Sequence, residues 1–204
     1  MLRGVLGPSK EQLIRQMASS DNRVALRAVD KLKDNGWFRD GSLRQANLAQ
    51  ANLQSAALAK ADMERANLEQ ADLTRAYLGE TVLRAANLCQ AKIQDANLRQ
   101  VILEQANLES ADLRGSYLAV SNLRGANLTG ACLHSANLWQ AALEGANLAR
   151  ADLRYALLNL TLFDQHTILP DGTRWTPDTD MGRFTNPGHL HFWHLPGPNG
   201  SKPL

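Results

Sequence analysis

The chain has 204 residues, of which 44% are apolar and only 5% aromatic. This predicts one domain, with at most small appendages, and a core of small aliphatic side chains. The 22 basic and 20 acidic residues leave a formal net charge of +2, which argues against a nucleic-acid-binding surface and against an acidic DNA mimic. No apolar run approaches the ~18 residues that a bilayer span needs, and two cysteines make no disulfide framework. We therefore expect a cytoplasmic protein.

Helix signals fill residues 1–40. Ser9 and Gln12 stand at the spacing of a capping box, and apolar residues on one helical face come directly after them. Ser20 or Asp21 can begin a second helix, which Asn35-Gly36 would end. The segment holds 8 basic and 5 acidic residues, so a basic arm for nucleic acid or a membrane surface is an alternative. We interpret the segment instead as a helical cap on the central part of the chain.

A five-residue period runs through the middle of the chain. From Leu43 to Ile168 every fifth residue is large and apolar, which makes 26 positions without an insertion. A small residue, usually Ala, stands two positions earlier, and Asn or Asp stands between them, as in Ala46-Asn47-Leu48. A period of five fits neither a helix nor an ordinary strand nor a coiled coil. It does fit a short straight segment followed by a corner, and four such segments would close a coil of 20 residues.

Two columns of residues support this 20-residue coil. When the sequence is written in rows of 20, one column holds only asparagine: Asn47, Asn67, Asn87, Asn107, Asn127 and Asn147. Another alternates in charge: Arg44, Glu64, Arg84, Glu104, Arg124 and Glu144. Residues one coil apart would therefore pair, although exposed ion pairs contribute only ~0–1 kcal/mol each.

The repeat resembles the A(D/N)LXX motif of the pentapeptide repeat family, over residues 41–169. The resemblance implies an all-β solenoid, a right-handed quadrilateral parallel β-helix with a leucine at the centre of each side. The 26 sides would make about 6.5 coils. A solenoid exposes strand edges at both ends. Residues 1–40 are thus expected to form a helical N-terminal cap, and residues 170–204 an irregular, aromatic C-terminal capping tail.

The end of the repeat is rich in large apolar residues. We expect five of them to thicken the last coil: Leu157, Leu158, Leu160, Leu162 and Phe163. The aromatic residues of the tail either fold back over this coil or pack against a second copy of the chain: Trp175, Phe184, Phe192 and Trp193.

Two groups of residues invite a chemical role. His189, His191 and His194 suggest a metal, but their spacing matches no helical ligand pair and no cysteine lies nearby in the sequence. Cys132 and His134 suggest a nucleophile and a base, yet a flat strand whose amides are all committed to stacking offers no oxyanion site. The interior, filled by Leu and Ala, leaves no room for a cofactor. We predict no catalytic, cofactor-binding or metal-binding residue, no enzyme, and no disulfide between Cys89 and Cys132.

The polar exterior of the predicted rod is interrupted. Outward positions along one corner are apolar: Val82, Ile102, Val120, Ala142, Leu160 and Leu162, with Tyr77, Tyr117 and Trp139 on the adjoining side. Clustered apolar residues on a polar surface indicate a contact site. The predicted protein-binding surface consists of Tyr77, Val82, Ile102, Tyr117, Val120 and Trp139. The alternative is that the first of these are isolated exposed side chains and that Leu160 and Leu162 belong to the C-terminal cap.

The sequence therefore predicts a non-enzymatic protein–protein interaction module or scaffold. Its partner is an unidentified protein or a second copy of the chain, bound through the corner surface or the C-terminal tail. The alternative function is binding of DNA gyrase or another topoisomerase, as implied by a resemblance to the quinolone-resistance pentapeptide proteins, which look like B-form DNA. Those rods use a strongly acidic face, and some carry loops. Residues 41–169 hold 11 basic and 12 acidic residues and no such loop, which disfavours that function.

Overall fold

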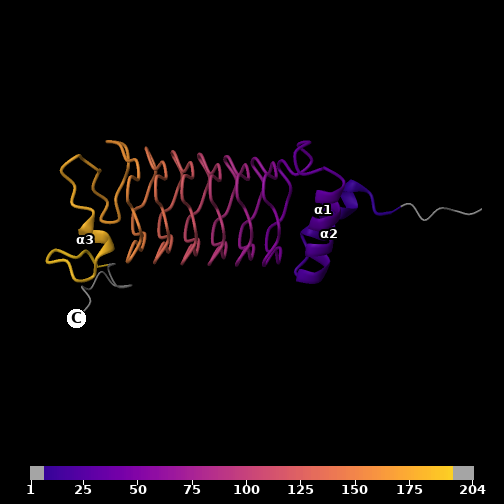
Figure 1. Ribbon diagram of the computed structural model, residues 1–204, viewed down its shortest axis with the longest axis horizontal. Helices are drawn as coiled ribbons and strands as arrows, with labels where there is room; N and C mark the ends of the chain where they lie inside the picture. Colours follow the sequence, from indigo (N-terminus) through magenta and orange to yellow (C-terminus); the bar gives the residue numbers. More distant parts are fainter. Residues whose placement is uncertain (1–6, 195–204) are drawn as a thin grey trace, which may run out of the picture.

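The computed structural model describes residues 7–194. These residues form a rod (Figure 1). Helices α1 (Lys10–Met17) and α2 (Asn22–Asp34) lie at one end, and the short helix α3 (Gly182–Thr185) lies at the other. A stack of coils fills the length between them. Within residues 7–194, no helix is both long and apolar enough to cross a bilayer.

Each coil has four sides, and each side pairs with the side 20 residues later. The strands are single parallel bridges, one residue per side. We number the sides by these bridging residues, whose side chains point outward. Side 1 runs from Asn47 to Asn147, side 2 from Asn52 to Asp152, side 3 from Ala57 to Leu157, and side 4 from Asp62 to Leu162.

Backbone hydrogen bonds between coils follow one pattern throughout the stack. On side 1 the N–H groups of Leu88 and Gln90 donate to the carbonyls of Asn107 (2.7 Å) and Glu109 (2.9 Å) in the next coil. The carbonyl of Ala86 accepts from Asn107 N–H at 2.9 Å. Every side thus presents two donors and one acceptor towards the C-terminal end of the rod. A coil without a successor leaves these groups unpaired, which makes the two ends of the stack chemically distinct.

The corners require a left-handed backbone. The last residue of each repeat has positive φ, for example 59° at Gln50. Four corners carry a glycine, but most carry residues for which this conformation costs about 1–2 kcal/mol. Val120, with φ of 61°, is the only β-branched residue among the corners of residues 41–169. Branching at Cβ makes this backbone conformation a true outlier, so Val120 is a strained position.

The interior is continuous and mostly apolar. Every central residue from Leu43 to Leu153 is at most 2% exposed, and the alanines two positions earlier line the same core. Fully burying a leucine stabilises the fold by about 1.5–3 kcal/mol, so the unbroken central column supplies the main driving force for folding.

The N-terminal helices supply the hydrogen bonds that a preceding coil would make. Helix α1 begins with the predicted capping box of Ser9 and Gln12. The Asn22 side-chain amide donates to the carbonyls of Asn52 and Gln54, both at 3.1 Å. Backbone carbonyls of residues 19 and 38 accept the N–H groups of residues 52 and 62. Much of the lower edge of the first coil is therefore occupied by this chain.

An ion pair ties the start of α1 to the segment before the first coil. Lys10 Nζ lies 2.6 Å from Asp40 Oδ2. The hydrogen bond from Lys10, together with those from Ser42, lowers the pKa of Asp40 to about 2. Asp40 therefore stays ionised, and the pair intact, in all but strongly acidic solution.

The expected series of central residues is wrong at its last member. Ile168 does not point inward but bridges Asn147, which is 21 rather than 20 residues earlier. Thr167 takes the small buried position and Leu169 the central one. One residue is thus inserted after Phe163. Residues 168 and 169 are both apolar, so the sequence does not reveal which of them is buried.

Asp164 accommodates the inserted residue. Its Oδ1 accepts the N–H of Gly145 at 2.8 Å and that of Thr167 at 3.0 Å. In the coil below, the corresponding N–H of Gly125 donates to the backbone carbonyl of Glu144. A carboxylate therefore replaces a backbone acceptor where the register changes.

The tail folds back over part of the last coil. Trp175 stacks on Phe163 at a centroid distance of 6.0 Å, and Phe184 of α3 is buried and packs edge-on against Trp193 at 6.1 Å. The N–H of Tyr155, at the end of side 2, donates to the carbonyl of residue 185 at 2.7 Å.

The expectation that all five large apolar residues thicken the last coil is wrong for three of them. Leu157, Leu160 and Leu162 are at least half exposed, because they occupy bridging or corner positions that point outward. Leu158 and Phe163 do pack against the core.

Candidate functional site

Exposed apolar side chains gather on two of the four sides. Apart from Tyr155, every large apolar residue of the coils that is exposed lies on side 3, on side 4 or at the corner between them. Tyr77 is 59% and Trp139 41% exposed. The central residues are buried, so this distribution comes from the bridging positions and from corner residues such as Val120 and Leu160.

Of the six predicted surface residues, Val82 and Ile102 were expected along one corner but lie on side 4 itself. Val82 and Ile102 are partly exposed and bridge each other directly on side 4. Tyr77 and Tyr117 lie on side 3, separated by the coil that contains Asn97.

Val120 and Trp139 complete the surface. Val120 occupies the corner itself, and its N–H donates to the carbonyl of Trp139 at 2.8 Å. We call the six residues the apolar surface: Tyr77, Val82, Ile102, Tyr117, Val120 and Trp139. Ala142, which the sequence also assigned to the corner, is 7% exposed and contributes little to it.

Three leucines extend the exposed apolar area to the end of the rod. Leu157 lies in the column of side 3 two coils beyond Tyr117, Leu162 lies in that of side 4 three coils beyond Ile102, and Leu160 lies at the same corner as Val120 two coils on. The 20-residue columns already group them with the apolar surface. This grouping was missed because the leucines were assigned to the C-terminal cap.

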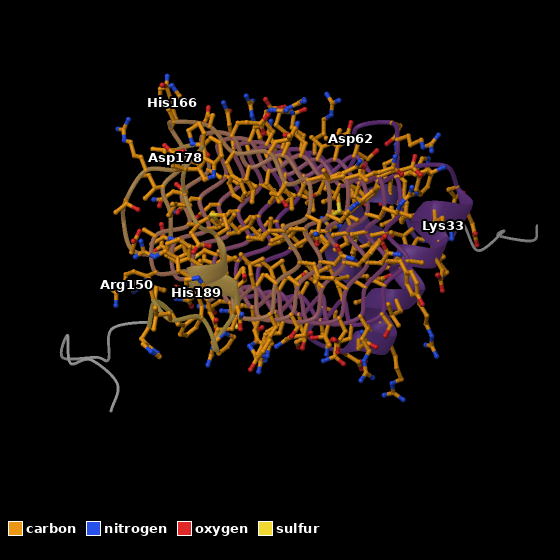
Figure 2. All side chains as sticks on the ribbon, turned by 60° about the vertical axis from the view of Figure 1, so that its left-hand side comes forward. Lys33, Asp62, Arg150, His166, Asp178 and His189 are labelled. Atoms are coloured by element: carbon orange, nitrogen blue, oxygen red, sulfur yellow. The ribbon has the colours of Figure 1, made fainter. Side chains whose placement is uncertain are left out.

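Charged residues border the apolar surface along side 4. Arg84 Nε lies 3.0 Å from Glu104 Oε2, and Arg124 Nη2 lies 2.6 Å from Glu144 Oε1, so neighbouring coils pair as the alternating column predicts. Arg44 departs from this pattern because it pairs more closely with Asp62 than with Glu64. Figure 2 shows charged side chains projecting outward around the rod, Asp62 and Arg150 among those it labels.

Side 1, on the opposite face, is polar and tightly bonded to itself. The amides of Asn67, Asn87, Asn107 and Asn127 each donate to the asparagine one coil below, for example Asn107 Nδ2 to Asn87 Oδ1 at 3.2 Å and Asn127 Nδ2 to Asn107 Oδ1 at 3.1 Å. The same Oδ1 atoms accept a backbone N–H two residues later, as from Glu109 at 3.2 Å. The asparagine side chains of side 1 thus bond mainly within the chain itself.

Side 2 carries a shallow hollow around Cys132, bordered by acidic and basic groups. Burial raises the pKa of the Cys132 thiol, and the carboxylates of Asp152 and Asp112 act in the same direction. Cys132 Sγ lies 3.9 Å from Asp152 Oδ2. The His134 ring packs edge-on against Tyr155 at 5.2 Å. The environment thus favours the protonated thiol, which is the opposite of what a nucleophile needs.

The acidic residues of this hollow are themselves paired. Burial alone would raise the pKa of Asp152, but hydrogen bonds from Arg154 outweigh it and hold that pKa below the ordinary value. Asp112 is held in the same way by Arg114. Cys89 and Cys132 are both free.

The three histidines of the tail make separate contacts. His189 Nε2 lies 2.8 Å from Asp180 Oδ2, and its Nδ1 accepts the N–H of His191 at 3.1 Å. The ring of His194 packs edge-on against Phe192 at 4.9 Å. Among the described residues 7–194, no group of three His, Cys, Asp or Glu residues is arranged to hold a metal ion.

A family model of repeats agrees with this architecture. The model of pentapeptide repeats, in 8 copies, matches residues 38–70, 66–105, 102–140 and 131–165. The chain belongs to the pentapeptide repeat family. Membership implies a right-handed β-helix solenoid, as the four-sided coils of this pentapeptide repeat protein also indicate. Members of the family are in general non-catalytic structural or binding modules.

Among solved structures the chain is similar to other pentapeptide repeat proteins. It is 38% identical to Rfr23 from the cyanobacterium Cyanothece 51142, over 48% of this chain and 63% of that one, with a TM-score of 0.41. It is 30% identical to HetL, involved in heterocyst differentiation regulation in Nostoc sp. strain PCC 7120, over 65% of this chain and 76% of that one, with a TM-score of 0.31.

A more distant similarity is to QnrB1, a plasmid-mediated fluoroquinolone resistance protein. The identity is 18%, over 64% of this chain and 79% of that one, with a TM-score of 0.40. The chain spans less than two thirds of Rfr23. No curated protein sequence matches it.

Proposed function

We propose that this pentapeptide repeat protein is a non-enzymatic protein-binding module whose contact site is the apolar surface of sides 3 and 4. The proposal rests on the way polar and apolar side chains are separated between different sides of the rod. Side 1 presents a closed asparagine ladder, whereas sides 3 and 4 expose aromatic and aliphatic side chains on the same backbone. Large exposed apolar areas rimmed by polar groups are typical of protein-binding sites. Tyrosine and tryptophan are also enriched among the residues that dominate binding energy.

Backbone strain at Val120 supports the same surface. A β-branched residue with φ of 61° costs stability, while residues such as Gln100 and Gln140 fill the equivalent corner one coil away. Strained positions tend to persist where a side chain serves a function. Val120 is 36% exposed and lies outside the buried core, so its side chain gains less from burial than a central leucine does.

The charge pattern supports a protein partner more than a DNA-like role. Basic and acidic residues alternate on side 4 and pair between coils, for example Arg84 with Glu104. A DNA mimic needs a continuous acidic face, which this arrangement interrupts in every second coil. Mimicry of DNA towards a topoisomerase is therefore not favoured.

The experiment is an affinity capture from a lysate of the host with matched variants. Ile102→Glu places a carboxylate in the apolar surface, in a column where side 4 already accepts Asp62 and Asn122. Ala149→Glu makes the same charge change on side 1, where Glu69 and Glu109 already occupy that column. We expect the wild type and Ala149→Glu to retain the same protein and Ile102→Glu to lose it, with all three chains folded.

Mass spectrometry quantifies the captured proteins, and the melting temperature checks folding. Equal capture by Ile102→Glu and the wild type would refute the apolar surface as the contact site. Loss with Ala149→Glu alone would move the site to side 1.

A further inference from the structure

The charged column of side 4 is complementary to itself when its order is reversed. Its six members alternate from a basic first residue to an acidic last one: Arg44, Glu64, Arg84, Glu104, Arg124 and Glu144. Two rods that pack antiparallel through side 4 keep each column opposite itself but reverse the order of the coils. Arg44 of one copy then faces Glu144 of the other, and Arg84 faces Glu104. Every member of the column meets the opposite charge, which favours this orientation.

The same arrangement brings the aliphatic residues of side 4 together. The midpoint of the charged column lies between Arg84 and Glu104, and in these two coils Val82 and Ile102 bridge each other. A two-fold axis through this midpoint places Val82 of each copy against Ile102 of the other. Both side chains are partly exposed, so the contact removes apolar surface from water. An apolar centre with polar groups around it is the usual anatomy of a protein interface.

The charged and the bridging columns lie on one face of the rod. Arg44 Nε is 2.8 Å from Asp62 Oδ2, which belongs to the bridging column. In the antiparallel arrangement Asp62 faces Asn122 of the second copy, whose side-chain amide can donate to a carboxylate. Both columns of side 4 are therefore free of opposed like charges.

Charge also specifies the register of the two rods. An axis through a coil, rather than between two coils, would set Arg84 against Arg84 of the second copy. Like charges opposite each other cost several kcal/mol and disfavour such a pairing. An axis moved by one whole coil keeps opposite charges together, but it separates Val82 from Ile102 and shortens the overlap. The axis between Val82 and Ile102 is therefore the favoured one.

Side chains at the corner after side 4 are matched in size. The corner residues of these six coils are Gln45, Arg65, Ala85, Gln105, Gly125 and Gly145. In the antiparallel register each of the three long side chains faces a glycine or an alanine, as Arg65 faces Gly125. The corners can thus approach each other without a steric clash.

The face of side 4 is accessible. Helix α2 is anchored through Asn22 to side 2, and residue 185 of the tail accepts the N–H of Tyr155 on side 2. Figure 2 shows Asp62 at the upper edge of the rod, whereas His189 of the tail lies lower. The side chains of Arg84 and Glu104 are 45% and 34% exposed. A second rod can therefore approach side 4 from a direction that these contacts leave open.

We propose that side 4 binds side 4 of a second copy of the chain, with the two rods antiparallel and the two-fold axis between Val82 and Ile102. Within each chain Arg84 Nε already lies 3.0 Å from Glu104 Oε2. In the dimer each guanidinium can donate to a carboxylate of both copies, because arginine carries five N–H donors. A two-fold contact uses one face twice and closes on itself, so the assembly stops at two. The contact spans one side of the rod, and small interfaces belong to weak, reversible complexes.

The test exchanges charges across the axis and measures mass by sedimentation equilibrium. The wild-type mass should rise from 22.4 kDa towards twice that value as the protein concentration increases. Arg84→Glu and Glu104→Arg should each raise the dissociation constant at least about tenfold, because each sets like charges opposite. An equimolar mixture of the two variants should associate like the wild type, since the introduced acid then faces the introduced base.

A second mixture tests the register. Arg84→Glu with Glu144→Arg supplies the same kinds of charge but leaves like charges opposite, so its association should stay weak. Glu109→Arg on side 1 is the control and should dimerise like the wild type, and melting temperatures check that all variants fold. A wild type that stays at 22.4 kDa up to about 1 mM overturns the proposal. So does a first mixture that fails to associate, or equal association of both mixtures.

The inference rests on the proposed function, because it names the partner of side 4, but the two can fail separately. A monomeric wild type whose capture of another protein depends on Ile102 would overturn the dimer and leave the proposed function standing. A dimer with the expected charge dependence, together with capture of other proteins that Ile102→Glu leaves unchanged, would do the reverse.

Discussion

Sides 1 and 3 share one backbone and one kind of interior but have opposite exteriors. Leu108 under side 1 and Leu98 under side 3 are equally buried, and both sides make the same pattern of backbone hydrogen bonds. Outside, side 1 presents asparagines bonded to each other, whereas side 3 alternates Tyr77 and Tyr117 with asparagine. The backbone and the core specify the fold, which leaves the outward positions free to differ. Function is therefore to be sought where the exterior departs from the repeat.

The first prediction has the largest expected effect. It tests whether the buried leucines under the two sides contribute equally to stability. Leu98→Ala and Leu108→Ala should each lower the free energy of unfolding by about 3 kcal/mol, because each leaves a cavity in a packed interior. Urea denaturation followed by circular dichroism measures both. A difference of more than about 1 kcal/mol between them would show that the exterior also changes how the core tolerates a cavity.

The second prediction compares how much the outward asparagines of side 1 and of side 3 contribute to the free energy of unfolding. Asn107→Ala removes hydrogen bonds with Asn87 and Asn127, and should cost about 2 kcal/mol because it leaves ladder groups unpaired. Asn97→Ala on side 3 removes the bond from Arg99 N–H and should cost about 1 kcal/mol or less. Equal losses in urea denaturation would mean that the ladder adds nothing beyond the local turn.

The third prediction concerns the strained corner of the apolar surface. Val120→Asn should raise the free energy of unfolding by about 1 kcal/mol, since asparagine tolerates positive φ and valine does not. The same change at Gln140, whose φ is 54°, is the control and should have little effect. Unchanged stability in Val120→Asn would argue that the corner is relaxed. Partner capture by this variant should fall, so stability and binding move in opposite directions.

The smallest effect is expected from acid. Arg154 lowers the pKa of Asp152, so this pair stabilises the fold above about pH 4 and the contribution is lost as the pH falls through the lowered pKa. Melting temperatures between about pH 5 and pH 2.5 should fall less steeply in Asp152→Asn than in the wild type. The difference should correspond to about 1 kcal/mol or less. Parallel curves would mean that the pair is screened by solvent.

Much of the rod could be predicted because its repeat leaves few choices. Inward positions must be apolar in every coil, so Leu48 and the central residues after it reveal the five-residue period. The asparagine column reveals the length of the coil. The outward columns also predicted the six residues of the apolar surface as a contact site, which stays a prediction. The sequence did not show how the apolar surface is divided between two sides and one corner. It does not reveal which of the two residues after a central leucine forms the bend.

The irregular end was predicted less well. Ile168 and Leu169 are both apolar, so the inserted residue, which Asp164 holds in place, left no mark on the hydrophobic pattern. Leu157 and Leu160 were assigned to a cap because leucines are usually buried, although their columns point outward.

The sequence by itself determined the family, the four-sided coil and the inward and outward positions, because a strict period forces every coil to repeat the same contacts. Only the tertiary structure decided which edges of the last coil residues 164–194 cover. Those contacts join segments that follow no repeat, so no periodicity records them. They depend on where a turn such as that at Asp164 sends the chain, and the hydrogen bonds that fix it become visible only in the folded molecule.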